Sequence, residues 1–246
     1  MLRYSGSKRR LLKHLPAPPL NTKVMIEPFA GSLAYSIHYA KPRIVAAEAN
    51  PLVRDLWHWL RDRATDADFK KLEAAKPMEK VNAKVWAAKH GFGEPETTLA
   101  RLQIASVVVG QLSSWMLYPQ HSFGLEEFSQ RLGYIKRALA PVRDDFLHPD
   151  ILSAAQQPGA FAFVDPPYLD TSANYKSKGA DHGGMNPKDV EDFVLGLSCP
   201  TLVTYGDGAE ETFPRLTWTK AVTRKVPILR GGGTRDRTEW YARLRF

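Results

Sequence analysis

Short apolar runs alternate with longer amphipathic stretches at the start of the chain. An apolar run at Lys23–Ile26 precedes a stretch with helical spacing at Leu33–Ala40. A second apolar run at Arg43–Ala47 precedes another helical stretch from Leu52 to about Arg63. A strand, a glycine turn, a helix and a second strand form a βαβ unit with parallel strands. The pattern therefore predicts an α/β fold with a doubly wound, mostly parallel, Rossmann-like sheet.

The middle of the chain lacks this alternation. Three segments there carry helix formers or apolar residues at helical spacing: Asp66–His90, Thr97–Leu117 and Phe128–Leu139. Gly91–Pro95 is expected to be a linker between the first two. We therefore expect a main domain formed by residues 1–65 and 141–246, with a helical subdomain inserted at 66–140.

The last third of the chain returns to the α/β pattern. Apolar runs at Thr201–Tyr205 and Trp240–Phe246 are expected to be strands of the same sheet. Leu169–Pro187 is rich in Gly, Ser, Asn and Lys and has no periodicity. It is expected to be a mobile surface loop.

Asp165-Pro166-Pro167-Tyr168 follows a predicted buried strand at Phe161–Val164. Neither proline can donate to a sheet ladder, so the pair ends the strand and leaves an acid and an aromatic ring at its carboxyl edge. Ligands bind at that edge of an open parallel sheet. A nucleobase needs an aromatic face and oxygen acceptors in its plane, which these residues could supply. The alternative is a plain turn with a solvated Asp and a half-buried Tyr.

Glu27-Pro28-Phe29-Ala30-Gly31-Ser32 follows the first predicted strand, and Glu48 follows the second. A glycine at a strand-to-helix turn lets a ligand approach the main chain closely. An acid about twenty residues further on is where the ribose hydroxyls of nucleotide-type cofactors are held. Together these residues indicate a pocket for an adenosine-containing cofactor. A simple tight turn is the alternative, since Leu33 stands where another glycine is expected.

The composition of the chain limits the kinds of binding partner and site that we expect. The 246 residues carry a net charge of +8, and basic residues gather in Met1–Lys13 and Arg215–Phe246. This surplus favours a polyanionic partner, with solvated tails as the alternative. The single Cys199 excludes an internal disulfide, and the scattered histidines predict no metal site. No signal peptide or membrane span is recognisable, so we expect a soluble, cytoplasmic protein.

Five motifs stand in a fixed order: Tyr4-Ser5-Gly6-Ser7-Lys8, Glu27-Pro28-Phe29-Ala30-Gly31-Ser32, Glu48 with Asn50, Asp145-Phe146, and Asp165-Pro166-Pro167-Tyr168. This set resembles the Dam-like (D12 class, alpha order) adenine-N6-specific DNA methyltransferases. The resemblance covers residues 1–63 and 140–246, including Arg237-Thr238-Glu239 as the closing motif. The middle differs, because Tyr118–Gly124 stands where the family carries a loop that enters DNA.

The resemblance implies that the chain is an enzyme that methylates a flipped adenine in duplex DNA. S-adenosylmethionine would be the cofactor and S-adenosylhomocysteine the product. The catalytic residues would be Asp165, Pro166 and Tyr168: the carboxylate and the carbonyl accept the amine hydrogens, and the ring stacks on the base. The implied cofactor-binding residues are Tyr4, Lys8, Glu27, Phe29, Gly31, Glu48, Asp145, Phe146 and Asp165.

Contacts to DNA phosphates are expected from the basic residues nearest these motifs: Arg9, Arg10, Lys176, Lys178, Arg235 and Arg237. A monomer in a bacterial or phage-infected cell is expected, in a restriction-modification or phage setting. Two alternatives stay open at this point. One is a methyltransferase for another exocyclic amine, cytosine N4 or a base in RNA. The other is a non-catalytic module that binds DNA or the cofactor and has kept the fold.

Overall fold

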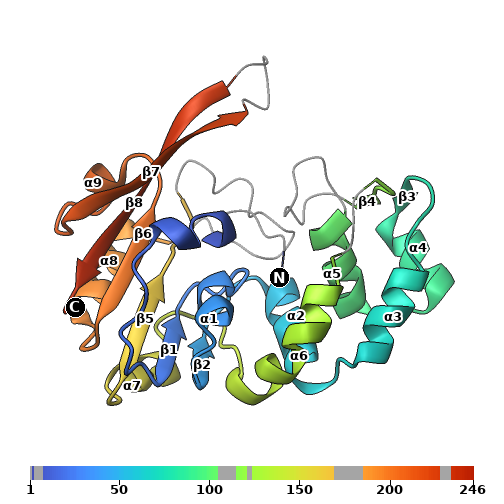
Figure 1. The fold of residues 1–246 in the computed structure, drawn as a ribbon, viewed down its shortest axis with the longest axis horizontal. Helices are drawn as coiled ribbons and strands as arrows, with labels where there is room; N and C mark the ends of the chain where they lie inside the picture. The colour runs from blue at the N-terminus through green and yellow to red at the C-terminus, as the bar shows by residue number, and fades with distance from the viewer. Residues whose placement is uncertain (1, 3–7, 105–114, 121–123, 169–184, 228–233) are drawn as a thin grey trace.

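A six-stranded sheet joins the two ends of the chain (Figure 1). The computed structural model describes residues 2, 8–104, 115–120, 124–168, 185–227 and 234–246. The strands, in order across the sheet, are β2 (Arg43–Ala46), β1 (Val24–Glu27), β5 (Ala160–Val164), β6 (Thr201–Tyr205), β8 (Thr234–Leu244) and β7 (Trp218–Pro227). The first four run parallel, and β8 is antiparallel to both of its neighbours. The expected α/β fold with a mostly parallel sheet is confirmed.

The strand order reverses between β1 and β5. The chain passes from β1 to β2 on one side and, after the helical middle, returns to β5 on the other side of β1. In an open α/β sheet, the ligand crevice lies at the carboxyl ends of the strands at such a reversal. Glu27 is the last residue of β1, Asp165 directly follows β5, and Glu48 lies two residues beyond β2. The topology therefore brings three acids from distant parts of the sequence to one edge.

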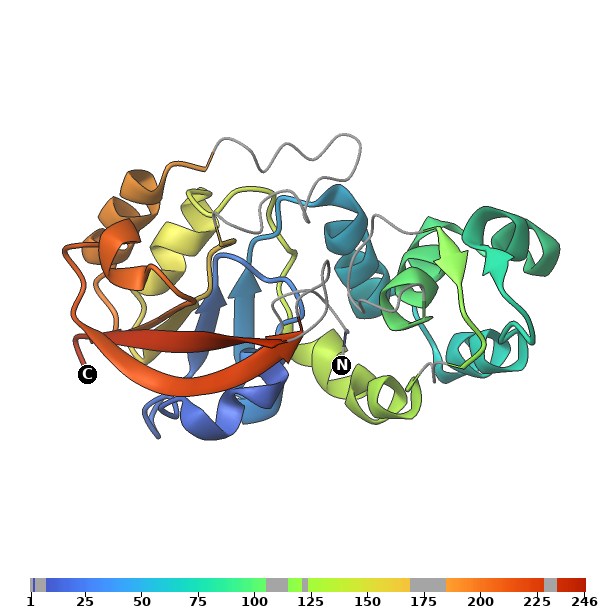
Figure 2. The ribbon, with the colours of Figure 1, turned by 90° about the horizontal axis from the view of Figure 1, so that it is seen from above.

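Both faces of the parallel strands are covered. Every residue of β1, β5 and β6 is buried, as expected for strands packed on both sides. One core joins Met25 to α1 (Ala34–Tyr39) and α2 (Pro51–Asp62), and a second joins Ile26 to helices on the opposite face. The latter helices are α7 (Pro149–Ala155), α8 (Pro187–Gly196) and α9 (Ala209–Thr212). Figure 2 shows α7 and α8, in yellow and orange, side by side.

The middle segment contains helices and a small two-stranded sheet. Its elements are α3 (Asp66–Ala74), β3 (Val81–Asn82), α4 (Ala83–His90), α5 (Glu94–Ile104), β4 (Met116–Leu117) and α6 (Glu126–Ala138). The expected single helix over 97–117 is wrong, because Met116 and Leu117 pair antiparallel with β3. The Tyr118 amide then donates to the Ile104 carbonyl, which brings β4 back to the end of α5.

The middle segment packs on the main sheet through α2, which shares a core with residues of α5 and α6. After α6, the chain returns along β2, where Leu139 bridges Ile44 and Arg143 bridges Ala47. The structure thus connects this segment closely to the sheet edge. That residues 66–140 form a separate inserted subdomain, with 1–65 and 141–246 as the catalytic domain, stays a prediction.

The final strands depart from the expectation in one respect. β6 matches the predicted strand, but β8 begins at Thr234 rather than Trp240 because it pairs with β7 along most of its length. Most of the expected loop, 169–184, lies outside the described residues, and Pro187 already begins α8. Among the described helices, none combines the length and the apolar character needed to cross a membrane.

Candidate functional site at the carboxyl edge of the sheet

Glu48 is held by backbone amides from two different elements. Its Oε2 accepts a hydrogen bond from the Gly31 N–H at 2.8 Å, and its Oε1 accepts one from the Asn50 N–H at 2.9 Å. Asn50 is the N-cap of α2, so one carboxylate ties the turn after β1 to the start of this helix. Burial raises the pKa of Glu48, and the two amide hydrogen bonds oppose that rise. Each oxygen retains a lone pair for a further donor.

The turn between β1 and α1 contains two residues in left-handed backbone conformations. Gly31 has φ of 44°, and Leu33, the N-cap of α1, has φ of 48° and ψ of 28°. Leu33 therefore adopts the conformation for which a glycine was expected, at a strain of about 1 to 2 kcal/mol. Its side chain is buried, and this apolar burial offsets the strain. The missing glycine thus does not prevent the tight turn.

An aromatic pair lies at the same edge. The rings of Phe29 and Phe146 are 5.2 Å apart between centroids, and both residues are half-buried. Phe146 packs in turn against Phe193 of α8, edge to face. The neighbouring Asp145 is exposed, and its Oδ1 accepts from the Leu147 amide. Within the predicted Asp145-Phe146 motif, the Phe146 ring thus contacts Phe29 in the turn after β1. The described hydrogen bond of the Asp145 side chain stays within its own loop.

Glu27 is almost completely buried at the end of β1. Its Oε1 accepts a hydrogen bond from the Ser36 amide of α1 at 2.8 Å. Burial raises the pKa of Glu27 to about 8, a rise that the negative charge of Asp165 increases and the Ser36 bonds reduce. Near neutral pH this carboxyl group is therefore mostly protonated. The Glu27 side chain thus connects the end of β1 to α1 inside the protein.

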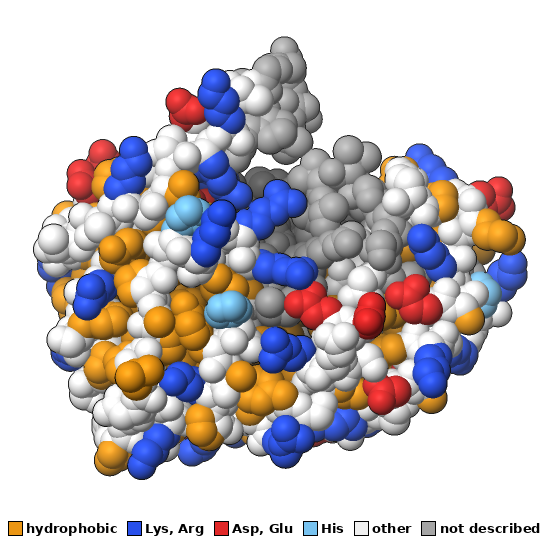
Figure 3. Space-filling view, in the orientation of Figure 1, with side chains coloured by type: hydrophobic (Ala, Val, Ile, Leu, Met, Phe, Trp, Pro, Cys, Tyr) orange, Lys and Arg blue, Asp and Glu red, His pale blue; other side chains and the backbone are white. Residues whose placement is uncertain are grey.

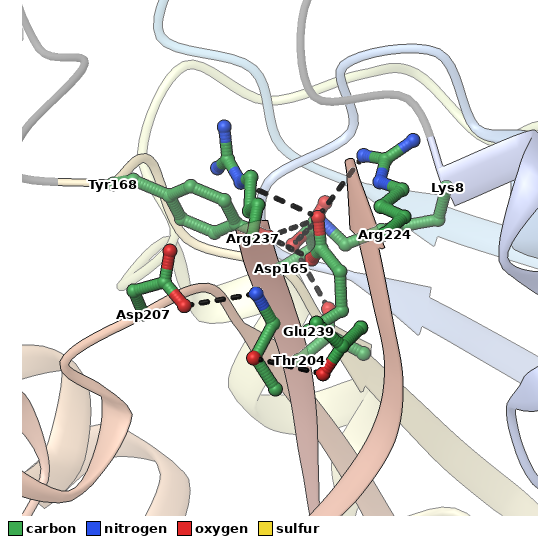
Figure 4. Close-up of polar contacts among 10 residues, drawn as sticks. Lys8, Asp165, Tyr168, Thr204, Asp207, Arg224, Arg237 and Glu239 are labelled. Atoms are coloured by element: carbon green, nitrogen blue, oxygen red, sulfur yellow. Dashed lines mark hydrogen bonds and ion pairs between the residues drawn. The ribbon is translucent and has the colours of Figure 1, made fainter. Parts of the chain in front are cut away.

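Asp165 is the centre of a polar network that Figure 4 shows. The Lys8 ammonium lies 2.6 Å from Asp165 Oδ1, and the Thr204 hydroxyl donates to the same oxygen at 2.8 Å. Burial raises the pKa of Asp165, while the ammonium and the hydroxyl hold it down. Among the described residues, both contacts fall on Oδ1. Oδ2 is thus the oxygen of this carboxylate that a ligand could use.

Tyr168 is a packed member of the network. Its hydroxyl accepts from Lys8 Nζ at 2.6 Å and donates to Glu239 Oε2 at 2.8 Å. The Arg237 guanidinium lies 4.8 Å from the centre of the ring, and Tyr205 meets it edge to face. Tyr168 is only 6% exposed, so its ring is not the open stacking surface that the sequence suggested.

Two arginines complete the network from the last two strands. Arg224 of β7 and Arg237 of β8 approach Glu239 Oε1 at 3.1 and 3.6 Å. Together with Lys8 they carry three positive charges, against two negative charges on Asp165 and Glu239. The described contacts thus join cations and acids from both ends of the chain. Thr204 and Arg224 were not among the predicted site residues. Thr204 lies on a predicted strand, whereas the strand that carries Arg224 was not predicted.

The predicted DNA-contacting residues do not form one described cluster. Arg9 pairs with Glu127 of α6 at 3.1 Å, Arg10 is exposed, and Arg237 belongs to the Asp165 network. Arg235 lies in β8, but its side chain is outside the described part, as are Tyr4, Lys176 and Lys178. On the face in Figure 3, Lys and Arg side chains gather near the middle, beside the residues drawn in grey.

Comparison with known proteins gives little information about this site. No family model and no curated protein match the chain. Among solved structures, the chain is similar to one from Methanobacterium thermoautotrophicum that is described as precorrin 8W decarboxylase. Their sequences are 13% identical, the match covers 95% of this chain and 88% of that chain, and the TM-score is 0.35. A likeness at this level transfers no activity.

These findings correct the prediction that the chain is a site-specific DNA adenine-N6 methyltransferase. No family model and no curated protein supports DNA adenine methylation, and the structural likeness does not support it either. The buried Tyr168 ring also offers no open face for a flipped base among the described residues. We therefore do not retain this activity, or its variants on cytosine N4 and RNA.

Proposed function

We propose that the chain binds S-adenosylmethionine at the carboxyl edge of β1 and β2 and is a methyltransferase with its acceptor at Asp165. The observation that carries the proposal is the Glu48 carboxylate, which two backbone amides hold at the reversal of strand order. An acid in this position is the group that binds ribose hydroxyls in nucleotide-type pockets. The motif order of the sequence supports the same cofactor.

The described residues fit the parts of this cofactor. The Glu48 oxygens would accept the two ribose hydroxyls through their remaining lone pairs. The half-buried rings of Phe29 and Phe146 offer an apolar wall for the adenine. Gly31 has no side chain to obstruct a ligand that approaches the turn. When bound, S-adenosylmethionine supplies an electrophilic methyl group on its sulfonium.

Asp165 would orient the acceptor. Asp165 Oδ2 can accept a hydrogen bond from the N–H or O–H of the group to be methylated. This bond increases the electron density on the nitrogen or oxygen of that group. Lys8 and Thr204 fix the carboxylate through Oδ1. Binding of duplex DNA is a separate prediction, to be tested by its salt dependence.

Titration calorimetry with S-adenosylmethionine and S-adenosylhomocysteine tests the proposal. The wild-type protein should show saturable binding of both, and Glu48→Gln should weaken it about tenfold or more by removing the charged acceptor. Glu191→Gln is the control, because Glu191 is also buried and accepts a backbone N–H, that of Arg215, but has no described bond to the turn after β1. If the wild-type protein bound neither compound at millimolar concentration, the proposal would be refuted.

A further inference from the structure

Trp57 of α2 reaches the same turn from inside the core. Its indole Nε1–H donates to the Gly31 carbonyl at 3.0 Å, and its side chain is fully buried. The fully buried indole thus has a polar contact with the backbone segment that would lie beneath the cofactor. Trp59, on the same helix and in the same apolar core, has no described hydrogen bond to its indole.

Both peptide groups that flank the Gly31 Cα are therefore held by side chains. The Gly31 N–H donates to Glu48 Oε2, which fixes the peptide plane before the Cα. The Gly31 carbonyl accepts from Trp57, which fixes the plane after it. Since peptide groups are planar, fixing both planes fixes φ and ψ of Gly31. This arrangement, which we name the turn clamp, holds Gly31 at φ of 44°.

The turn clamp also determines where Glu48 lies. One oxygen of the Glu48 carboxylate accepts a hydrogen bond from the Gly31 N–H. The other accepts one from the N–H of Asn50, the N-cap residue of α2. Trp57 lies two turns further along α2 and bonds back to Gly31. A rotation of the turn away from Trp57 would move the Gly31 amide and thus the carboxylate that it holds. The indole N–H of Trp57 therefore acts on the cofactor pocket indirectly, through Gly31 and Glu48.

We infer that Trp57 is a positioning residue for the cofactor, acting through Gly31 on Glu48. The inference rests on the proposed function, since it concerns the same pocket. A purely structural role of Trp57 would affect unfolding but leave the affinity for S-adenosylmethionine unchanged. A positioning role requires a loss of affinity in folded protein.

The test compares Trp57→Phe with Trp59→Phe. Both variants remove the same volume from one core, but only the first removes a described hydrogen bond. We expect about tenfold weaker binding of S-adenosylmethionine for Trp57→Phe, and a change of less than about twofold for Trp59→Phe, by calorimetry on folded protein. Equal affinities of Trp57→Phe and wild type would overturn the inference.

A second substitution covers the case in which Trp57→Phe does not fold. Benzothienylalanine, placed at position 57 or 59 by codon suppression, keeps the bicyclic shape and replaces the N–H by sulfur. We expect weaker cofactor binding only for the substitution at 57, and equal binding by both would refute a role for the N–H. Absence of binding by the wild-type protein would instead refute the proposed function, and the inference with it.

Discussion

Replacing Glu27 by glutamine should make the unfolding free energy less dependent on pH. Burial raises the pKa of Glu27 to about 8 in the folded protein, whereas the ordinary value is 4.5. Between these two values, the folded state holds a proton that the unfolded state has released. The unfolding free energy contributed by this group therefore falls as the pH rises, by about 1.4 kcal/mol per pH unit, and levels off above about pH 8.

The expected magnitude follows from the same two values. Relative to Glu27→Gln, the wild-type protein should lose about 3 kcal/mol of stability between about pH 5.5 and about pH 8. A glutamine at this position keeps an oxygen that can accept the Ser36 amide, so the packing and the hydrogen bond change little. The difference in unfolding free energy between wild type and Glu27→Gln should thus be small at acidic pH and large at basic pH.

Urea unfolding at a series of pH values measures this difference. Glu79→Gln, at an exposed position, controls for the loss of one negative charge from the chain. The stability gain from Glu27→Gln should grow steadily with pH, and Glu79→Gln should show no such trend. A gain that is the same at about pH 5.5 and about pH 8 would refute the assignment of a buried, protonated Glu27.

Two further predictions concern the packing of Tyr168. Gly206→Ala should destabilise the protein by about 1 to 3 kcal/mol, since a Cβ would lie 3.0 Å from Cε2 of Tyr168, whereas nothing lies within 4 Å of one at Gly196. Thermal unfolding of Gly206→Ala and Gly196→Ala checks this, and equal losses would contradict it. Tyr168→Phe should cost about 1 to 3 kcal/mol because it removes the hydroxyl bonded to buried Glu239. In urea unfolding, Tyr39→Phe, whose hydroxyl has no described hydrogen bond, should cost clearly less, and a larger loss there would count against the network.

The sequence allowed the sheet edge to be predicted because its signals are local. A short apolar run that ends in two prolines marks β5, and a glycine turn after another run marks β1. Asn50-Pro51 begins α2 with an N-cap and a proline at the first turn, which is a strong helix start. Each of these features depends on a few adjacent residues.

The parts that were missed depend on contacts between distant residues. Asn186-Pro187 carries the same helix-start signal as Asn50-Pro51, but it lies at the edge of a segment without periodicity, and α8 was not predicted. β4 has only two residues, and it is a strand because β3 pairs with it. Tyr168 is covered by distant residues, among them Lys8, Tyr205 and Glu239, which is 71 residues away in sequence. A short peptide motif alone cannot indicate which groups will cover it.

A crystal structure of the protein with S-adenosylhomocysteine would test the central claim most directly. We expect the two ribose hydroxyls to lie within hydrogen-bonding distance of the Glu48 oxygens, and the adenine to lie against Phe29 and Phe146. The sulfur should face Asp165, where the Lys8 ammonium and the Thr204 hydroxyl fix Oδ1. Density for the compound at another place, or its absence from crystals grown at saturating concentration, would contradict the account.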